Sequence, residues 1–252
     1  MHALRFLHIP KTAGTTLRDV LKRIYWPRRR FEFSGEADVD LARFHALSEA
    51  TRANIALYMG HAPIETGIGW ADQCVTITVL RDPVSRVRSF CQHVAEGKSP
   101  YLRAAFPPEN FDLDKFLWSG NLELSNLQTK MLVNRRICDA PLPAHLSESG
   151  CIQLAIDNLL HRVACFGIQE QFDESMTRFG SLLNRRMAAY TARNQADPRQ
   201  PLVFQQRHLQ RIADLNTLDL EVYREAVAHF QRIRSRESAV SRPTTKAGEV
   251  GA

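Results

Sequence analysis

A lysine, a glycine and two threonines with potential for anion binding lie in one short segment, at Lys11, Gly14, Thr15 and Thr16. Apolar residues precede this segment and a helical pattern of apolar residues follows it, so we expect a strand to pass into a helix there. The first turn of a helix offers unpaired backbone N–H groups and the positive end of the helix dipole, and both favour an anion. Gly14 also permits close backbone approach. The sequence therefore predicts a phosphate-binding loop formed by Lys11, Thr12, Ala13, Gly14, Thr15 and Thr16.

This loop differs from the loop that binds nucleoside triphosphates. That motif is GxxxxGK[ST], with a lysine directly after its last glycine and a hydroxyl group that binds magnesium. Here Lys11 comes before Gly14, and no GK[ST] sequence occurs in the chain. The shorter loop can hold one terminal group closely but cannot wrap around a triphosphate. If the bound ligand donates a group in a transfer reaction, Lys11 would lie beside that group and would neutralise charge on the leaving oxygen.

A second anion-binding feature follows the apolar run at 75–80, which is typical of a strand buried on both faces. Arg81 comes directly after this run, at the carboxyl end where open α/β sheets bind ligands. Asp82 and the proline after it favour the start of a helix. Ser89 lies about two turns into that helix. Arg81 and Ser89 can therefore face one pocket and hold one phosphate, to which the guanidinium donates as a fork.

His61 is our first candidate for a general base, because it follows the expected short strand at 55–60 and would lie at the same sheet edge. The sequence leaves three other candidates open. His8 lies within the first strand, His93 lies one helical turn beyond the phosphate-binding serine, and Glu65 is more remote. No cysteine or histidine pair has the spacing of a zinc site, and none of this chemistry needs a metal.

The elements that would position these residues alternate between strands and helices. Strands are expected at 3–9, 55–60, 75–80 and 163–168. Helices are expected at 15–24, 40–53, 83–92, 113–119, 122–132, 151–160, 172–186, 205–215 and 218–234, with loops at 98–111 and 188–201. This alternation favours a parallel sheet with helical crossovers.

The predicted fold class is α/β, with a central parallel sheet similar to that of P-loop nucleotide-binding proteins, flanking helices and a helical C-terminal part. We expect residues 1–234 to form a single domain. The polar residues 235–252 are expected to be a disordered tail.

The composition sets further bounds. No apolar run is long enough for a transmembrane helix, and the first strand begins too close to Met1 for a signal peptide or an anchor. The five widely spaced cysteines fit reduced thiols, so we expect a cytoplasmic protein without stable membrane insertion. The net charge of +6 suits an anionic ligand. Basic and aromatic residues are not interleaved as in single-stranded nucleic acid binders, so no nucleic acid partner is expected.

Together, these motifs resemble those of the sulfotransferases that use 3′-phosphoadenosine 5′-phosphosulfate (PAPS), and most closely the group containing heparan sulfate 2-O-sulfotransferase. Residues 8–16 are similar to the family's 5′-phosphosulfate loop, and 79–90 are similar to its 3′-phosphate motif. The similarity covers most of the chain, because it continues through 126–130, 166–175 and 215–223. Two positions depart from the family pattern. Lys130 stands where arginine is frequent, and Asn134 stands where glycine is frequent.

The resemblance implies that a sulfuryl group moves in line from PAPS, the co-substrate, to an acceptor hydroxyl on a carbohydrate. His61 would be the general base, and Lys11 would stabilise the leaving group. The loop that contains Lys11 would hold the 5′ side of the nucleotide, while Arg81 and Ser89 would hold its 3′-phosphate. The two departures concern details of the cofactor edge and of the acceptor side.

Two other functions remain open from the sequence. One is an ATP-dependent small-molecule kinase, although ATP lacks a 3′-phosphate and we can assign no magnesium ligands. The other is a non-enzymatic module that binds a polyanion or nucleic acid through the cluster Arg28, Arg29 and Arg30. The sequence specifies neither the acceptor and its sulfated position nor the oligomeric state.

Overall fold

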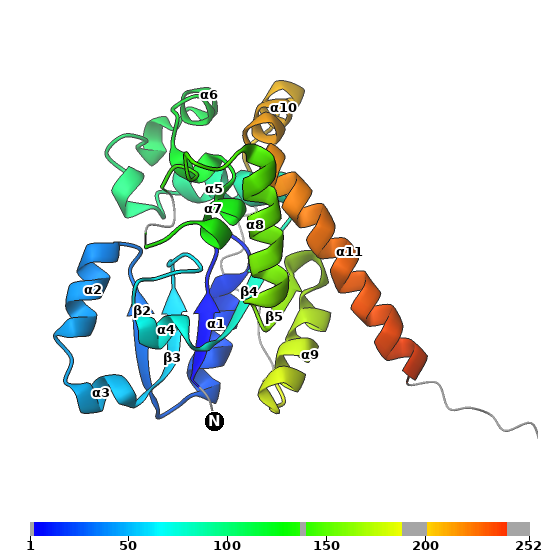
Figure 1. Ribbon diagram of the computed structural model, residues 1–252. Helices are drawn as coiled ribbons and strands as arrows, with labels where there is room; N and C mark the ends of the chain where they lie inside the picture. Colours follow the sequence, from blue (N-terminus) through cyan, green and yellow to red (C-terminus); the bar gives the residue numbers. More distant parts are fainter. Residues whose placement is uncertain (1–2, 137–139, 188–200, 241–252) are drawn as a thin grey trace, which may run out of the picture.

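Five parallel strands form the centre of the protein in the computed structural model, which describes residues 3–136, 140–187 and 201–240 (Figure 1). Their order across the sheet is β2-β3-β1-β4-β5. The strands are β1 (Leu4–Leu7), β2 (Arg29–Phe33), β3 (Ile55–Gly60), β4 (Val75–Leu80) and β5 (Cys165–Ile168). Helices flank this sheet, so the predicted α/β class with a parallel sheet is confirmed.

The central strand β1 determines which loops meet. It pairs in parallel with β3 and with β4, so that Leu7 lies opposite Gly60 on one side and Thr78 on the other. All three strands therefore end at the same edge of the sheet, and the segments after them carry Lys11, His61 and Arg81. A parallel sheet of this kind is typical of apolar strands that are buried on both faces.

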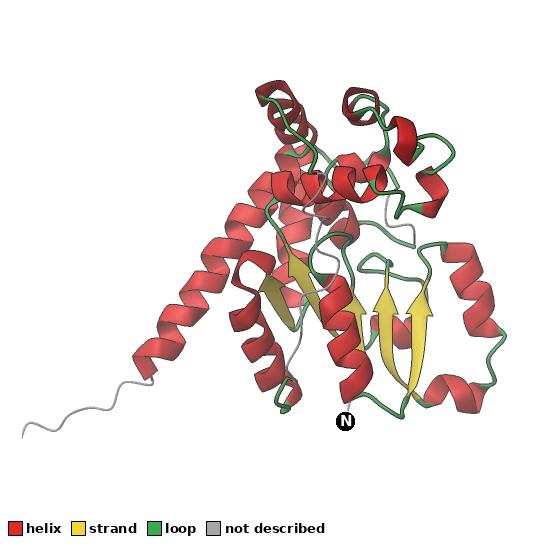
Figure 2. Cartoon of the chain, turned by 180° about the vertical axis from the view of Figure 1, so that it is seen from behind, coloured by secondary structure: helices red, strands yellow, loops and turns green. Residues whose placement is uncertain are grey.

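One face of the sheet packs against α1 (Gly14–Ile24) and α9 (Phe172–Leu183), which lie in front of the strands in Figure 2. Leu17, Val20 and Leu21 recur at helical spacing on α1 and are fully buried. Met176 and Phe179 of α9 join the same cluster. This packing fixes the start of α1 beside the end of β1.

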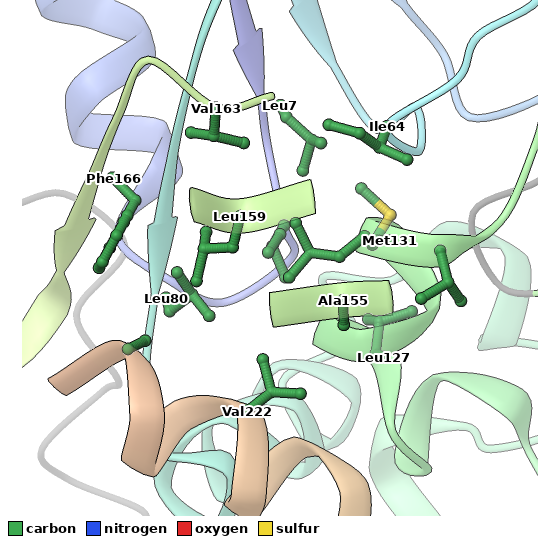
Figure 3. Close-up of a cluster of buried hydrophobic side chains, with 14 of the residues drawn as sticks. Leu7, Ile64, Leu80, Leu127, Met131, Ala155, Leu159, Val163, Phe166 and Val222 are labelled. Atoms are coloured by element: carbon green, nitrogen blue, oxygen red, sulfur yellow. The ribbon is translucent and has the colours of Figure 1, made fainter. Parts of the chain in front are cut away.

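The opposite face packs against α7 (Leu127–Val133), α8 (Glu148–His161) and α11 (Thr217–Val240). Figure 3 shows Leu7 and Leu80 from the strands among Leu127, Leu159 and Val222 from these three helices. All five side chains are buried. The cluster holds α7 and α11 against the end of β4, where Arg81 begins the next loop.

A helical layer lies beyond the carboxyl ends of the strands (Figures 1 and 2). It contains α5 (Pro83–Ala95), α6 (Leu113–Leu117), α10 (Gln206–Leu215) and the short 3-10 helices η1 (Pro100–Leu102), η2 (Pro108–Asn110) and η3 (Leu122–Leu124). Its own core contains Val87, Phe90, Phe116, Leu117 and Ile212. This layer covers the edge at which the sequence predicts the site.

The remaining elements cover β2 and β3 or connect the sheet. They are α2 (Ala37–His45), α3 (Glu49–Ala53), α4 (Gly69–Asp72) and the 3-10 helix η4 (Gln169–Gln171). Phe44 of α2 and Ala71 of α4 pack with Phe31 and Tyr58 of the sheet. No helix among the described residues combines the length and apolar character that crossing a bilayer requires.

The structure corrects four details of the predicted elements. Residues 29–33 form a fifth strand, at a position where the sequence predicts none. The helix predicted at 40–53 is two helices, because Ser48 caps the second by accepting a bond from Thr51. The helix predicted at 122–132 is divided at Asn126, whose φ of 47° interrupts the helix. Helix α11 continues to Val240, past the predicted end at 234.

The longer α11 has a simple cause in the sequence, since no proline or glycine occurs between residues 235 and 240. The helical part of the predicted disordered tail is therefore a correction. Residues 241–252 and most of the loop predicted at 188–201 lie outside the described residues.

Candidate functional site

A cavity of about 1140 Å³ opens at the carboxyl edge of the sheet, beneath the helical layer. The segments after β1, β2, β3 and β4 contribute to its wall, together with α5. Eight of the nine predicted site residues line it, namely Lys11, Ala13, Gly14, Thr15, Thr16, His61, Arg81 and Ser89. The structure therefore brings together groups that are up to 78 residues apart in the chain.

The loop after β1 has an uncommon backbone. Lys11 has φ 69° and Ala13 has φ 62°, although neither is glycine. A left-handed conformation at a residue with a side chain costs on the order of 1 kcal/mol, and such residues gather at functional sites. Backbone turns of this kind point successive N–H groups into one hollow that suits an anion.

Thr12 is the predicted loop residue that does not line the cavity. Its side chain is fully buried, and its hydroxyl donates a 2.9 Å hydrogen bond to the carbonyl oxygen of Ile9. The structure thus places the Thr12 side chain away from the cavity, and binding of a ligand by Thr12 stays a prediction. The hydroxyl instead ties the loop to the end of β1, which holds the strained residues on either side of it.

Position 14 has no space for a side chain, so it requires glycine. A side chain at this position would collide with the imidazole ring of His8, which lies against the first turn of α1. His8 is in turn buried, and its ring stacks on Phe6 with 5.2 Å between the ring centroids. The absence of a side chain at Gly14 lets the start of α1 approach the cavity closely.

Lys11 and Arg81 form the cationic part of the cavity. The Arg81 guanidinium donates through Nη1 to the Lys11 carbonyl oxygen at 3.0 Å, which couples the two loops. Burial, and then the nearby charge of Arg81, lowers the pKa of Lys11 to about 8. Burial also lowers the pKa of Arg81, and its Nε is enclosed without a protein partner. Two partly desolvated cations on the wall of one cavity favour an anionic ligand there.

The backbone of Arg81 is clamped from α7. The Gln128 side chain accepts from the Arg81 N–H at 3.0 Å and donates to the Arg81 carbonyl oxygen at 2.8 Å. Gln128 is fixed in turn, since Asp219 of α11 accepts the N–H groups of Gln128 and Thr129. The Asp82 N–H donates to Glu170 at 3.1 Å. Arg81 and the residue after it are therefore held in place by α7, α11 and Glu170, which are far from them in the sequence.

Helix α5 begins at Asp82, whose carboxylate accepts the Ser85 N–H at 2.7 Å. Ser89 follows one further turn along the same helix, and both serines line the cavity beside Arg81. Arg88 lines it as well, with its guanidinium 5.1 Å from the centre of the Phe204 ring. This side of the cavity offers hydroxyl and guanidinium donors to one ligand.

His61 has a defined tautomer. Its Nδ1 lies 2.9 Å from the carbonyl oxygen of His8, and a carbonyl oxygen can only accept. Nδ1 therefore carries the proton, and Nε2 of the neutral ring is left as an acceptor. Burial lowers the pKa of His61, which favours this neutral form. Gly60 makes the placement possible, because its φ of 130° and its close approach to the Phe33 backbone exclude a side chain.

The three other candidates for the base lie at different places. His8 lines the cavity, with 4.4 Å between the centroids of its ring and the His61 ring, and burial holds its pKa well below the usual range. His93 also lines the cavity, and burial with Lys11 lowers its pKa to about 4. Glu65 lies elsewhere, in ion pairs with Arg135 and Arg162.

Several cavity residues were missed by the sequence analysis. Ser34, Gly35 and Glu36 follow β2 and line the cavity next to His61. The buried Asp40 carboxylate fixes this loop by accepting the N–H groups of Ser34 and Gly35. The alternation of Phe31 and Phe33 with polar residues is the sequence signal that predicts the strand, and with it the loop. Tyr101 and Glu123, hydrogen-bonded to each other, also line the cavity.

The two positions that depart from the family pattern have structural roles. Lys130 is buried, and its ammonium donates to the Leu122 carbonyl oxygen at 2.8 Å. Asn134 donates to the Ala140 carbonyl oxygen at 2.9 Å. Lys130 thus ties α7 to η3 of the helical layer, and Asn134 ties the end of α7 to Ala140.

Comparison with known proteins leaves the site to be interpreted from its own geometry. No protein-family model matches the chain, and no curated protein matches it. Within the described ranges, no group of three or more histidine, cysteine, aspartate or glutamate side chains is placed to hold a metal ion.

Proposed function

We propose that the protein is a sulfotransferase that moves a sulfuryl group from PAPS to an acceptor hydroxyl. The observation that carries this proposal is the meeting of Lys11, Arg81 and the acceptor nitrogen of His61 at one cavity. Two cationic sites on one sheet edge suit a nucleotide with phosphates at two places. The strand order and the helix that begins at Gly14 also support a P-loop-like fold.

Different residues of the cavity would bind the two phosphate-bearing ends of PAPS. The first turn of α1, with Thr15 and Thr16, would bind the 5′-phosphosulfate. Arg81 and Ser89 would bind the 3′-phosphate, which is the group that distinguishes PAPS from ATP. The volume of about 1140 Å³ exceeds that of a common ligand pocket, roughly 300–1,000 Å³, and leaves room for part of an acceptor beside the nucleotide.

In the reaction, the acceptor oxygen would attack sulfur while the bond from sulfur to the 5′-phosphate oxygen breaks. His61 Nε2 would take the hydroxyl proton, because Nδ1 already donates to the His8 carbonyl oxygen. Lys11 would neutralise the charge that develops on the departing phosphate. The products are a sulfate ester and 3′-phosphoadenosine 5′-phosphate (PAP). The family resemblance favours a carbohydrate as the acceptor.

A transfer assay tests this proposal against the kinase alternative. The protein is incubated with a panel of mono- and oligosaccharides and with either sulfur-labelled PAPS or γ-phosphate-labelled ATP. We expect label to pass from PAPS alone, without added metal, and to be lost in His61→Ala. Arg224→Ala, an exposed change on α11, is the control and should transfer normally. Transfer of phosphate from ATP instead would refute the proposal.

A further inference from the structure

Exposed arginines and one exposed tryptophan gather at the amino-terminal edge of the sheet, opposite the cavity. The chain leaves α1 and enters β2 at this edge, and Trp26 is 73% exposed there, next to exposed Arg28 and Arg29. Figure 1 shows the C-terminal ends of α1 and α9 along the same edge. Arg185 and Arg186, which follow α9, are exposed as well. We call these five residues the basic face.

The basic face borders a hollow with excess positive charge. The hollow measures about 590 Å³, and four arginines and one glutamate line it. The glutamate, Glu32, already pairs with Lys22 at 2.7 Å. Arg43 pairs with Asp40, a residue outside the lining. A negatively charged partner is therefore favoured at this hollow.

The end of α9 belongs to the same electrostatic region. Burial raises the pKa of Tyr25, while Arg28 and Arg185 both lie close enough to act in the opposite direction. The arginines of the loop before β2 and of the segment after α9 therefore flank one residue. The positive charge is spread over a face rather than confined to a single turn.

We propose that the basic face docks the protein onto membranes that contain anionic phospholipids. Tryptophan prefers the headgroup level of a bilayer, because its ring is apolar and its N–H is polar. Arginines next to it would contact lipid phosphates. A single-stranded nucleic acid would need several stacking rings, whereas Phe31, the other aromatic residue of the hollow, is buried. Docking by this edge directs the cavity away from the bilayer.

Vesicle sedimentation tests this proposal independently of any enzymatic activity. The full chain is mixed with vesicles of phosphatidylcholine alone or of equal parts phosphatidylcholine and phosphatidylserine. We expect binding only to the anionic vesicles. Each cation near an anionic surface contributes roughly fivefold to binding, so Arg28→Glu with Arg29→Glu should weaken it by more than about 25-fold. Trp26→Ala alone should also weaken binding of the chain to the anionic vesicles. This loss should persist at moderate salt, because the tryptophan ring carries no charge.

The matched control is Arg224→Glu with Arg232→Glu, which changes the net charge equally on exposed positions of α11. This control should bind as the unaltered chain does, and circular dichroism should show that every variant is folded. Equal loss in the control, or no binding to anionic vesicles, would overturn the proposal. Binding of a single-stranded oligonucleotide without binding of vesicles would also overturn it, in favour of a nucleic acid partner.

Discussion

Burial sets the protonation state of the two residues assigned to the chemistry. Burial lowers the pKa of His61 from its ordinary 6.5, so the ring is neutral near pH 7 and Nε2 can accept a proton. Burial together with Arg81 lowers the pKa of Lys11 to about 8, so its ammonium is still charged near pH 7. A base must be neutral and a charge neutraliser must be protonated, and these two conditions overlap between the two pKa values.

The first prediction is a bell-shaped dependence of kcat/KM on pH. The rate should rise as pH rises through the lowered pKa of His61, below 6.5, and should fall above about 8 as Lys11 loses its proton. Lys11→Arg should keep the rising limb and remove the falling limb, because arginine does not titrate in this range. A falling limb that persists in Lys11→Arg would assign that limb to another group.

The second prediction concerns the space at the start of α1. In Gly14→Ala, the added methyl group would meet the His8 ring and displace either that ring or the loop. We expect a loss of about 1–3 kcal/mol in the free energy of unfolding, together with loss of nucleotide binding. Gly69→Ala is the control, since nothing lies within 4 Å of its added methyl group. Thermal denaturation compares the two, and equal melting temperatures would contradict the packing described for His8.

At the scale of elements, the sequence predicts those parts of the fold whose pattern is local. Strands β3 and β4 begin and end where their apolar runs do, because both are buried. β2 was missed, because charged residues mask the alternation of its two phenylalanines at the sheet edge. The sequence could not predict the hydrogen bond from Thr12 to Ile9 or the clamp from Gln128 to Arg81, since both depend on contacts that only the folded chain creates.

The third prediction tests that clamp. Gln128→Leu would leave the partly buried N–H and carbonyl groups of Arg81 without their partner. The cost should be about 1–3 kcal/mol in the free energy of unfolding, and nucleotide affinity should fall because Arg81 is no longer fixed. Gln153→Leu alters an exposed glutamine on α8 and should leave both quantities nearly unchanged. Unfolding in urea and nucleotide titration give the two values, and unaltered affinity in Gln128→Leu would show that Arg81 does not need the clamp.

At the scale of the whole molecule, the sheet separates two charged surfaces. Its carboxyl edge carries the cavity with Lys11 and Arg81, and its amino edge carries the basic face. Variants of one surface should leave the other intact, because the strands and their two buried clusters lie between them. The proposed chemistry therefore depends on the cavity alone, and most directly on whether that cavity recognises a 3′-phosphate.

Calorimetric titration without metal tests most directly whether the cavity recognises a 3′-phosphate. PAP, ADP and ATP are each titrated into the unaltered chain and into Arg81→Ala. We expect PAP to bind far more tightly than the other two. Loss of a charge-assisted phosphate contact should cost about 1.5–3 kcal/mol, so Arg81→Ala should weaken PAP binding by roughly 10- to 150-fold. ADP should lose much less. Equal affinity for ATP, or PAP binding that is unaffected in Arg81→Ala, would contradict the assignment of a PAPS site.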